Sequence, residues 1–529
     1  MPKIKIPIKT PIYQNVDEIV LTEFNAALID GYMDESGNTY RRPGLTLWNN
    51  LWTGAKVDGL YWWKKYGYLI AVSNGRIWKV TAAGAVPVEI TGDTLIAGTR
   101  PIFCEDQTHL FMANGGRITH YNNAGATTAM ADANAPTAVT HIAFHDQYLI
   151  CNNVGTGQMH YSNLATPLVW AALNYVVSES NPDNIEAMNI AWREILLLGR
   201  DSAEIYYDDG VYPFSRLEGA FCERGCSAPY SLAFFDNTWY WLDHTRRVIR
   251  IEGRSPTVIS TPFDKTIQGY TTISDVMSDL VEIGGRTFWV LSFPTEEKTL
   301  VYDYMPKLWY EWTWWNSKIA AHQRWLGNCV CYAKEWNKWL VGSRFDGKIY
   351  EMSQTVYTDE DDAIRTVRRT GHVYHETLTR KRSNSVELKV RRGVGFPAGA
   401  PDEVTGTDGE IYTCIIDHTS TTLDKPITGQ DWVLYWKHMG ITGGVWFEGV
   451  SYSAHIPYLI VRWRDDGKST WGNEHYIDLG KVGDTEFIGK LKRLGIYSAR
   501  QWEFILSDAV PLVLCEAEES VEVLEDEND

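Results

Sequence analysis

The chain has 529 residues, a formal net charge of −18 and 13% aromatic residues. This length exceeds what one core supports, so we expect two or three domains of roughly 100 to 250 residues each. The acidic balance disfavours tight binding of duplex DNA, which needs a basic surface to neutralise phosphates. The chain has no apolar run of the roughly 18 residues that span a bilayer and no signal-peptide core at its start, so we expect synthesis in a cytoplasm and no membrane-spanning segment.

The many aromatic residues, the 43 glycines and the short alternating apolar runs favour an all-β fold. Residues 1–45 are predicted to form an extended N-terminal arm, with a local apolar stretch at Ile19-Val-Leu and a turn at Asp34-Glu-Ser-Gly37. One role for such an arm is to supply the strand that closes a ring of sheets, because the last sheet edge of such a ring must pair with something.

One pattern returns between residues 54 and 352: an aromatic or apolar run, a polar turn, and a second run. The first runs start at residues 68, 109, 148, 194, 238, 287 and 339, so successive copies are 39 to 52 residues apart. This spacing suits one four-stranded propeller blade per copy. The pairs of runs are Tyr68-Leu-Ile-Ala-Val with Arg76-Ile-Trp-Lys-Val, His109-Leu-Phe-Met with Arg117-Ile-Thr-His-Tyr, Tyr148-Leu-Ile-Cys with Gln158-Met-His-Tyr, Glu194-Ile-Leu-Leu-Leu with Ala203-Glu-Ile-Tyr-Tyr, Thr238-Trp-Tyr-Trp-Leu with Arg247-Val-Ile-Arg-Ile, Thr287-Phe-Trp-Val-Leu with Lys298-Thr-Leu-Val-Tyr, and Trp339-Leu-Val-Gly with Lys348-Ile-Tyr-Glu-Met.

Each pair is predicted to form one β-hairpin, with turns such as Asn74-Gly75 and Asp346-Gly347 between β-branched and aromatic residues. A single hairpin cannot bury its apolar face and must stack on its neighbours. The sequence therefore predicts a seven-bladed β-propeller over residues 46–357. The alternative is an irregular pair of β-sandwiches whose spacing is coincidental.

The remaining chain is predicted to form a second β-domain. A charge-segregated stretch at 358–370 is typical of a linker. Period-two alternation predicts a C-terminal β-sandwich made of residues 371–396 and 457–515. The Gly-, Thr- and Asp-rich residues 397–456 are too long for a plain loop and predict a small inserted aromatic-rich module. Residues 516–529 carry eight acids and no base, so we expect an acidic disordered tail.

No motif of the common hydrolase, metalloprotease, P-loop or dinucleotide-binding sites is present in the sequence. The close pairs His141/His145 and His372/His375 are more typical of exposed or hydrogen-bonded histidines on strands than of metal ligands. We therefore predict no catalytic residues, no metal and no cofactor, and a protein that is not an enzyme.

Two further stretches have a structural and a functional interpretation. Asp465-Asp-Gly467 followed by Trp471 is similar to the Asp-box hairpin turn of sialidases and other propellers, which is structural and not catalytic. The stretch from Trp309 to Trp315 is either a sugar or protein contact or a filler of the space between blades, and we favour the filler.

The order of several short motifs resembles the tail-hub, or nozzle, proteins of short-tailed bacteriophages, also called packaged-DNA stabilisation proteins. The likeness spans nearly the whole chain except the insert and the tail. The motifs that carry it are Arg42-Pro-Gly-Leu45, Ala191-Trp-Arg-Glu-Ile-Leu-Leu-Leu-Gly with Glu204-Ile-Tyr-Tyr, Glu223-Arg-Gly-Cys-Ser-Ala-Pro-Tyr, Leu300-Val-Tyr-Asp with Trp309-Tyr-Glu-Trp, Leu479-Gly-Lys-Val-Gly483, Arg493-Leu-Gly-Ile, and Phe504-Ile-Leu-Ser-Asp-Ala-Val-Pro511.

This resemblance implies a structural virion protein of the phage tail, assembled in the host cytoplasm. It implies a homohexamer below the portal and its adaptor ring, which extends the DNA channel, retains packaged DNA, conducts it during ejection, and carries fibres, spikes and a needle or plug. Acidic walls fit a passage that surrounds DNA without adhering to it. The alternatives are a tail-associated glycan-binding or glycan-cleaving protein and an adhesin of cellular origin.

The predicted insert resembles a small aromatic module of phage tail proteins that is distantly similar to chitin-binding modules. Its candidate carbohydrate contacts are Tyr412, Trp432, Tyr435 and Trp436. The other interpretation is that these rings only hold a small core, and we favour it. The ordinary hub lacks this insert.

Overall fold

A computed structural model of the chain describes residues 3–9, 27–178, 181, 183–210, 214–252, 255–391, 458–479 and 486–524, with short pieces inside 403–452. The chain divides into two compact units. The propeller unit is Pro43–Asp362, and the second unit combines Met1–Arg42 with Ala363–Asp529.

The propeller unit contains seven runs of four antiparallel strands, which we number sheets 1 to 7 in chain order. Sheets 1 to 4 are β6–β9 (Val57–Trp63, Tyr68–Ser73, Arg76–Val80, Val88–Ile90), β10–β13 (Ile102–Glu105, Leu110–Ala113, Thr119–Tyr121, Thr128–Ala129), β14–β17 (Ile142–His145, Tyr148–Asn152, Gln158–Tyr161, Tyr175–Val177) and β18–β21 (Ile185–Ala191, Glu194–Gly199, Ala203–Tyr207, Ser215–Cys222). Sheets 5 to 7 are β22–β25 (Ala233–Phe235, Thr238–Leu242, Val248–Glu252, Ser255–Val258), β26–β29 (Met277–Ile283, Arg286–Phe293, Lys298–Asp303, Leu308–Glu311), and β32, β33 and β34 (Gly327–Ala333, Lys338–Ser343, Lys348–Ser353) with β5 (Gly44–Asn50).

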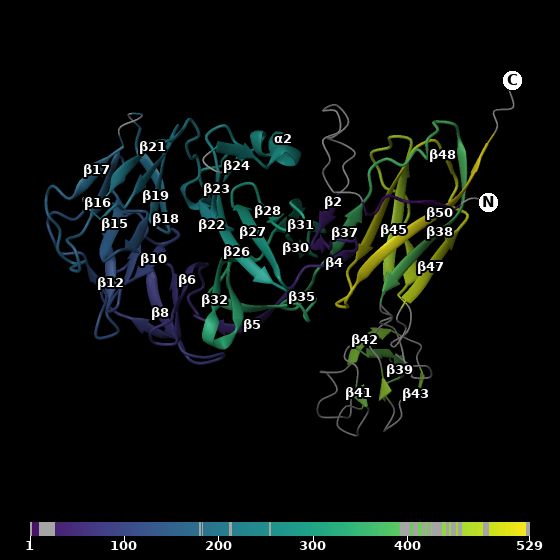
Figure 1. The fold of residues 1–529 in the computed structure, drawn as a ribbon. Helices are drawn as coiled ribbons and strands as arrows, with labels where there is room; N and C mark the ends of the chain where they lie inside the picture. Colours follow the sequence, from purple (N-terminus) through teal and green to yellow (C-terminus); the bar gives the residue numbers. More distant parts are fainter. Residues whose placement is uncertain are drawn as a thin grey trace. The chain divides into compact units, whose positions relative to one another are not determined.

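The sheets follow one another around a common centre (Figure 1). The first strand of each sheet from β10 onward lies against the first strand of the next, and β32 lies against β6. A Cβ on Gly59 of β6 would meet Pro101 and Phe103 at the start of sheet 2, which completes the circle. The first strands therefore form the inner wall of a ring.

Strand β5 closes this ring. It pairs antiparallel with β34, from Lys348 opposite Asn50 to Ser353 opposite Gly44. The last sheet thus takes its fourth strand from the beginning of the unit, and its edge is covered as a ring requires. The short strands β35 (Thr358–Asp359) and β36 (Asp362–Ala363) continue from β5 in the same sheet.

The predicted hairpins occupy the second and third strands of all seven sheets. The turn between β7 and β8 shows why these residues fold so: Asn74 and Gly75 have φ of 52° and 74°, the left-handed pair that a two-residue hairpin turn needs. The prediction of an all-β propeller is confirmed by this arrangement.

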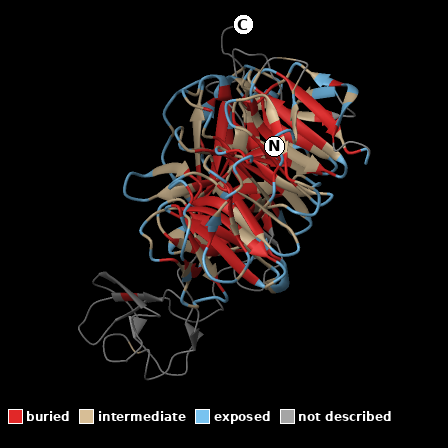
Figure 2. Ribbon diagram, turned by 90° about the vertical axis from the view of Figure 1, so that its left-hand side faces the viewer, coloured by how far each residue is buried: buried red, intermediate tan, exposed pale blue. Residues whose placement is uncertain are grey.

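The core lies between adjacent sheets, where buried strands alternate with exposed turns (Figure 2). Between sheets 4 and 5, for example, Leu196 and Leu198 pack with Trp239 and Trp241. All six residues of β7 are buried. A strand covered on both faces has no solvent side, and this explains why the middle strands are continuously apolar.

Short elements fill the connections between sheets. They are the 3-10 helices η1 (Pro229–Ser231), η2 (Thr261–Phe263) and η3 (Lys334–Trp336), the helix α2 (Asp264–Gln268), and the hairpin of β30 (Thr313–Asn316) and β31 (Ala321–Arg324).

The second unit has two sheets around one core. Val386 and Leu388 from one sheet pack with Val461 and Phe504 from the other. The first sheet runs β3 (Gly31–Met33), β4 (Thr39–Arg41), β50 (Val513–Val523), β38 (Lys381–Arg391) and β47 (Glu486–Lys492), with β1 (Lys3–Lys5) on β50 and β48 (Ile496–Tyr497) on β38. The second runs β2 (Ala27–Ile29), β37 (Thr366–Arg369), β49 (Arg500–Leu506), β45 (Tyr458–Asp465) and β46 (His475–Asp478).

Short strands also occur within 403–452. One sheet orders β42 (Trp436–Gly440), β40 (Ile411–Cys414), β39 (Glu403–Thr405) and β43 (Gly444–Val445), and β41 (His418–Thr419) pairs with β44 (Ser451–Tyr452).

Two segments differ from the sequence-based boundaries. The described parts of the N-terminal arm, β1 to β4, pair within the second unit, and the strand that closes the ring begins only at Gly44. Residues 358–370, expected to be a linker, contain β37. Strand pairing with distant segments, which a local composition signal does not reveal, explains both differences.

The acidic tail requires a correction, because residues up to Val523 belong to β50 and are not disordered. Their acids alternate with buried Ala517 and Val521, so one side of the strand reaches the core. Glu519 also points inward, where its carboxylate accepts a hydrogen bond of 2.8 Å from the Tyr497 hydroxyl. Residues 525–529 of the predicted tail lie outside the described residues.

Candidate binding surfaces of the propeller

An ion pair bridges the centre of the propeller ring. Arg100 precedes sheet 2 and Asp279 lies on β26 of sheet 6, and these two sheets are not neighbours. The guanidinium donates two hydrogen bonds, of 2.6 and 3.0 Å, to the Asp279 carboxylate. The Val330 amide in sheet 7 donates a third, of 3.1 Å, to the same carboxylate. Two hydrogen bonds between one guanidinium and one carboxylate make a strong ion pair, and this pair ties opposite parts of the ring together.

A second contact between sheets that are not neighbours involves His141, just before β14. Its Nε2 lies 3.2 Å from the carbonyl oxygen of Pro229, and its ring stacks on Tyr230 with centroids 5.5 Å apart. Burial lowers the pKa of His141 to about 4, so the ring is neutral at pH 7. Residues at the start of sheet 3 and just before sheet 5, which are not neighbouring sheets, therefore meet inside the ring.

The tryptophan-rich stretch serves mainly as packing. Trp309 is 3% exposed and Trp312 is fully buried. Trp312 packs edge-on against Trp325 with centroids 5.4 Å apart. Trp314 is partly exposed, and its Nε1 donates a 2.8 Å hydrogen bond to Asp362. These contacts favour the filler interpretation.

The Asp-box-like segment is a turn after β45. Asp466 and Gly467 have positive φ angles, and the Asp466 carboxylate accepts hydrogen bonds from the amides of Ser498 and Ala499. Trp471 packs under guanidinium groups, with Arg464 4.9 Å from its ring centroid. The carboxylates here are occupied in holding the turn, which fits a structural role.

Little of the predicted carbohydrate site can be placed. Trp432 and Tyr435 lie outside the described residues, and Trp436 is the first residue of β42. Tyr412, on β40, is 3% exposed. A ring buried to this degree has no exposed face for a sugar.

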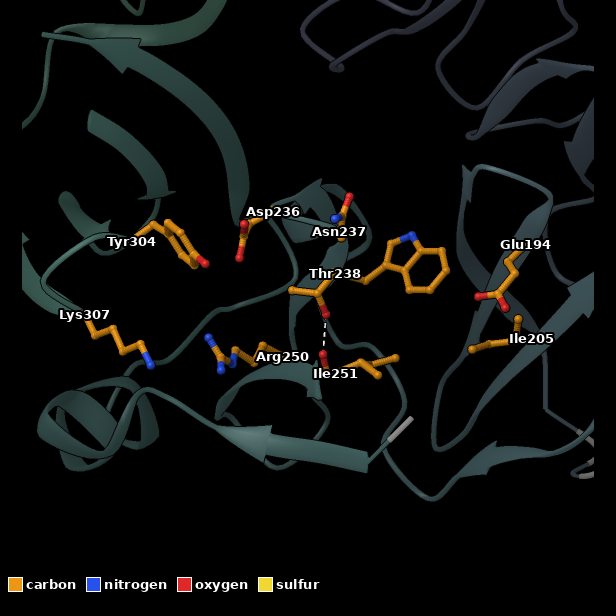
Figure 3. Close-up of a pocket in the computed structure, with 10 residues that line it drawn as sticks. Glu194, Ile205, Asp236, Asn237, Thr238, Arg250, Ile251, Tyr304 and Lys307 are labelled. Atoms are coloured by element: carbon orange, nitrogen blue, oxygen red, sulfur yellow. Dashed lines mark hydrogen bonds between the residues drawn. The ribbon is translucent and has the colours of Figure 1, made fainter. Parts of the chain in front are cut away.

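A pocket of about 390 Å³ opens where sheets 4, 5 and 6 meet (Figure 3). Asp236 and Tyr304 face one another in it, and a hydrogen bond to Asp236 raises the pKa of the Tyr304 hydroxyl. Arg250 and Lys307 lie on the same side of the pocket. The described lining holds acids and bases but neither His, Cys nor Ser.

A pocket of about 520 Å³ lies between sheets 6 and 7, and Tyr332, Trp339, Glu282 and Gln354 belong to its lining. Like the first pocket, it is built on the turn between the first and second strands of a sheet. Both pockets therefore open on the same face of the ring.

Across the described ranges, no three His, Cys, Asp or Glu side chains come together in a way that could hold a metal ion. In the same part of the chain, no helix has the length and apolar character needed to cross a bilayer.

Comparison with known families decides the identity of the propeller. Residues 25–357 match the model of the phage stabilisation family, described as "Bacteriophage P22 Gp10, beta-propeller". The chain belongs to this family. It is a structural protein of the phage tail that serves DNA stabilisation, and the resemblance found from the sequence is confirmed.

Other comparisons add little to this family membership. No curated protein matches the chain. Among solved structures, the extracellular domain of a putative one-component system from B. thetaiotaomicron is 11% identical, with a TM-score of 0.40, and the match covers 92% of this chain and 62% of that one. YCF48 bound to D1 peptide matches with 8% identity, a TM-score of 0.36, and 57% and 95% coverage. The N-terminal domain of Nup159 matches with 8% identity, a TM-score of 0.37, and 61% and 98% coverage.

Sequence reasoning missed the pair at the centre of this phage propeller and both pockets. Arg100 and Asp279 stand 179 residues apart, and nothing local marks them as partners. The pockets did leave a signal, because Asn237-Thr-Trp239 and Asn337-Lys-Trp339 repeat at the same place in sheets 5 and 7.

Proposed function

We propose that this chain is the nozzle, or hub, of a short phage tail. In this role it extends the channel of the portal and adaptor ring, retains packaged DNA, and conducts the DNA during ejection. Family membership over residues 25–357 is the observation that carries the proposal. The chain acts as a homohexamer in the virion after assembly in the host cytoplasm.

The closed centre of the propeller supports a passage between copies. The Arg100–Asp279 pair spans the ring, and its side chains are 15% and 9% exposed. Opening this centre for duplex DNA would break a largely buried ion pair and leave its charges without partners, which is costly. A conduit is therefore better built from several propellers around a shared axis, which closed rotational symmetry provides.

Charge supports passage without adhesion. The net charge of −18 repels phosphate, whereas a basic wall would bind DNA more tightly with every phosphate it neutralised. The mechanism is geometric, because a stiff wall retains or releases the genome without catalysis. The exposed outer surfaces of such a wall are available to the adaptor proteins and to the fibre, spike and needle or plug proteins.

Electron microscopy of the purified chain, alone and mixed with its portal–adaptor complex, tests this function. We expect six copies around an axial opening wide enough for duplex DNA, below the adaptor ring. Particles that lack the chain should fill with DNA and then lose it. A chain that stays monomeric beside the complex, with particles that keep their DNA without it, would overturn the proposal.

A further inference from the structure

The pocket between sheets 6 and 7 contains an aromatic pair with an accessible face. Tyr332 on β32 lies directly opposite Trp339 on β33, and their ring centroids are 4.8 Å apart at an angle of 32°. Tyr332 is 38% exposed, and Trp339 is partly exposed. Rings with one apolar face and one polar edge are favoured where a ligand covers the face and water reaches the edge.

Polar groups surround this pair in fixed positions. The Tyr332 hydroxyl donates a 2.7 Å hydrogen bond to Oδ1 of Asn337, which leaves the Asn337 amide nitrogen as a donor. Asn337 is held in the left-handed conformation, with φ of 51°, at the end of η3. Lys338 forms an ion pair with Glu351, so that carboxylate is also held in place.

Gln354 is positioned by a close approach to Gly284. This glycine has φ of +62°, and a Cβ on it would collide with the Gln354 amide. Both amide groups of the pocket can donate and accept hydrogen bonds, and the Glu282 carboxylate accepts them. A few placed polar groups beside aromatic faces, in a volume of about 520 Å³, are the usual make-up of a small-molecule site.

The described lining of the related pocket of sheet 5 lacks an accessible aromatic pair. Phe234 and Trp239 occupy the positions of Tyr332 and Trp339. Trp239 is only 5% exposed, and its Nε1 lies 3.3 Å from Oδ1 of Asn189. Its ring is therefore used for packing, and the polar rim of that pocket, with Arg250 and Lys307, lies beside Tyr304 instead (Figure 3).

We propose that the pocket between sheets 6 and 7 binds one or two rings of an uncharged saccharide. The C–H face of a pyranose would cover the Tyr332–Trp339 pair, and its hydroxyl groups would bond to Asn337, Gln354 and Glu282. The charged lining residues are Glu282, Glu351 and Lys338, which sum to −1. This charge disfavours uronic acids and nucleotides, whose anionic groups would be repelled.

Isothermal titration calorimetry on the full chain tests the site, with maltotriose and tri-N-acetylchitotriose as uncharged probes and trigalacturonate as the charged one. We expect at least one uncharged probe to bind with a dissociation constant on the order of 1 mM, and trigalacturonate to bind at least about tenfold more weakly. No heat from either uncharged probe, or tighter binding of the charged one, would overturn the proposal.

Matched variants locate the binding. Tyr332→Ala, on an exposed side chain, should weaken the binding at least about tenfold, and Gln354→Ala about threefold. Lys307→Ala in the related pocket should leave the affinity unchanged. If Tyr332→Ala binds like the parent chain while its hydrogen exchange remains native, the site is not here. Loss of binding in Trp432→Ala would move it to the inserted module and equally refute the proposal.

Discussion

The largest fully buried side chains of the propeller are rings, among them Trp63, Trp289 and Trp312, whereas those of the second unit include Arg42, Arg368 and Arg500. A ring of similar sheets can use the same apolar contact repeatedly. The second unit has to hold chain segments that do not repeat, and directed hydrogen bonds hold them.

The arginines of the second unit show how this works. Arg368 donates a 3.0 Å hydrogen bond to the carbonyl oxygen of Ile8, and Arg41 donates one of 2.7 Å to that of Val510. These bonds fix the N-terminal segments against parts of the chain more than 300 residues later. Buried charge thus specifies the path of the chain, at the risk of a large loss of stability if one partner is removed.

Removing Arg500 should have the largest effect. Its guanidinium bonds to Asp465 at 2.6 and 2.9 Å and lies 3.7 Å from the fully buried Glu519. Arg500→Met would leave two carboxylates without this partner, and we expect a loss of about 5 kcal/mol. Peptide-resolved hydrogen exchange should show faster exchange in the second unit alone. Equally faster hydrogen exchange in the propeller would show that buried arginines do not stabilise the second unit in particular.

Trp289→Ala tests the apolar side of the comparison. The ring is fully buried and lies 5.5 Å from Tyr240 and 6.4 Å from Trp309, measured between centroids. We expect a loss of about 4 kcal/mol from the transfer and cavity terms. Chemical denaturation should show the loss in the free energy of unfolding, and hydrogen exchange should place this loss in the propeller. An unchanged melting temperature would show that sheets 5 and 6 do not pack as described.

The neutral His141 predicts a pH response of the propeller. Burial lowers the pKa of His141 in the folded state to about 4, below its ordinary value of 6.5, so the stability it contributes is full above pH 6.5 and is lost as the pH falls toward 4. The free energy of unfolding should fall by about 3 kcal/mol in total, since each unit of pKa shift is worth about 1.4 kcal/mol.

We expect His141→Gln to reduce the dependence of the free energy of unfolding on pH between pH 6.5 and pH 4. The measurement is the free energy of unfolding of the propeller between pH 7 and pH 4, compared between parent and variant so that other titrating groups cancel. Parallel curves would mean that His141 is not buried at the centre of the ring.

The smallest effect is expected for an exposed ion pair in the second unit. Arg382 and Glu522 are 3.5 Å apart, and their side chains are 51% and 42% exposed. Arg382→Ala should change stability by less than about 0.5 kcal/mol, because solvent screens the pair. Comparing this variant with Arg500→Met shows whether the loss of stability comes from burial of the ion pair or from its charge alone. A large loss here would show that charge alone matters in this unit.

The sequence by itself determined the hairpins of the propeller and the all-β class. Asn74-Gly75 and similar turns act over a few residues, and the apolar runs on either side have to be covered whatever surrounds them. The order of the motifs was also enough to indicate the phage family. These signals are local, or they repeat at a regular interval, and can be read without knowing which strands meet.

Only the tertiary structure decided how the chain closes and what its surfaces offer. The pairing of Gly44–Asn50 with β34, the Arg100–Asp279 pair and the inward Glu519 each join residues that are distant in sequence. Whether an aromatic residue is buried like Trp239 or accessible like Tyr332 also depends on the neighbouring sheet. The free energy of such contacts comes from geometry that forms after the hairpins have assembled, so the local sequence carries no record of it.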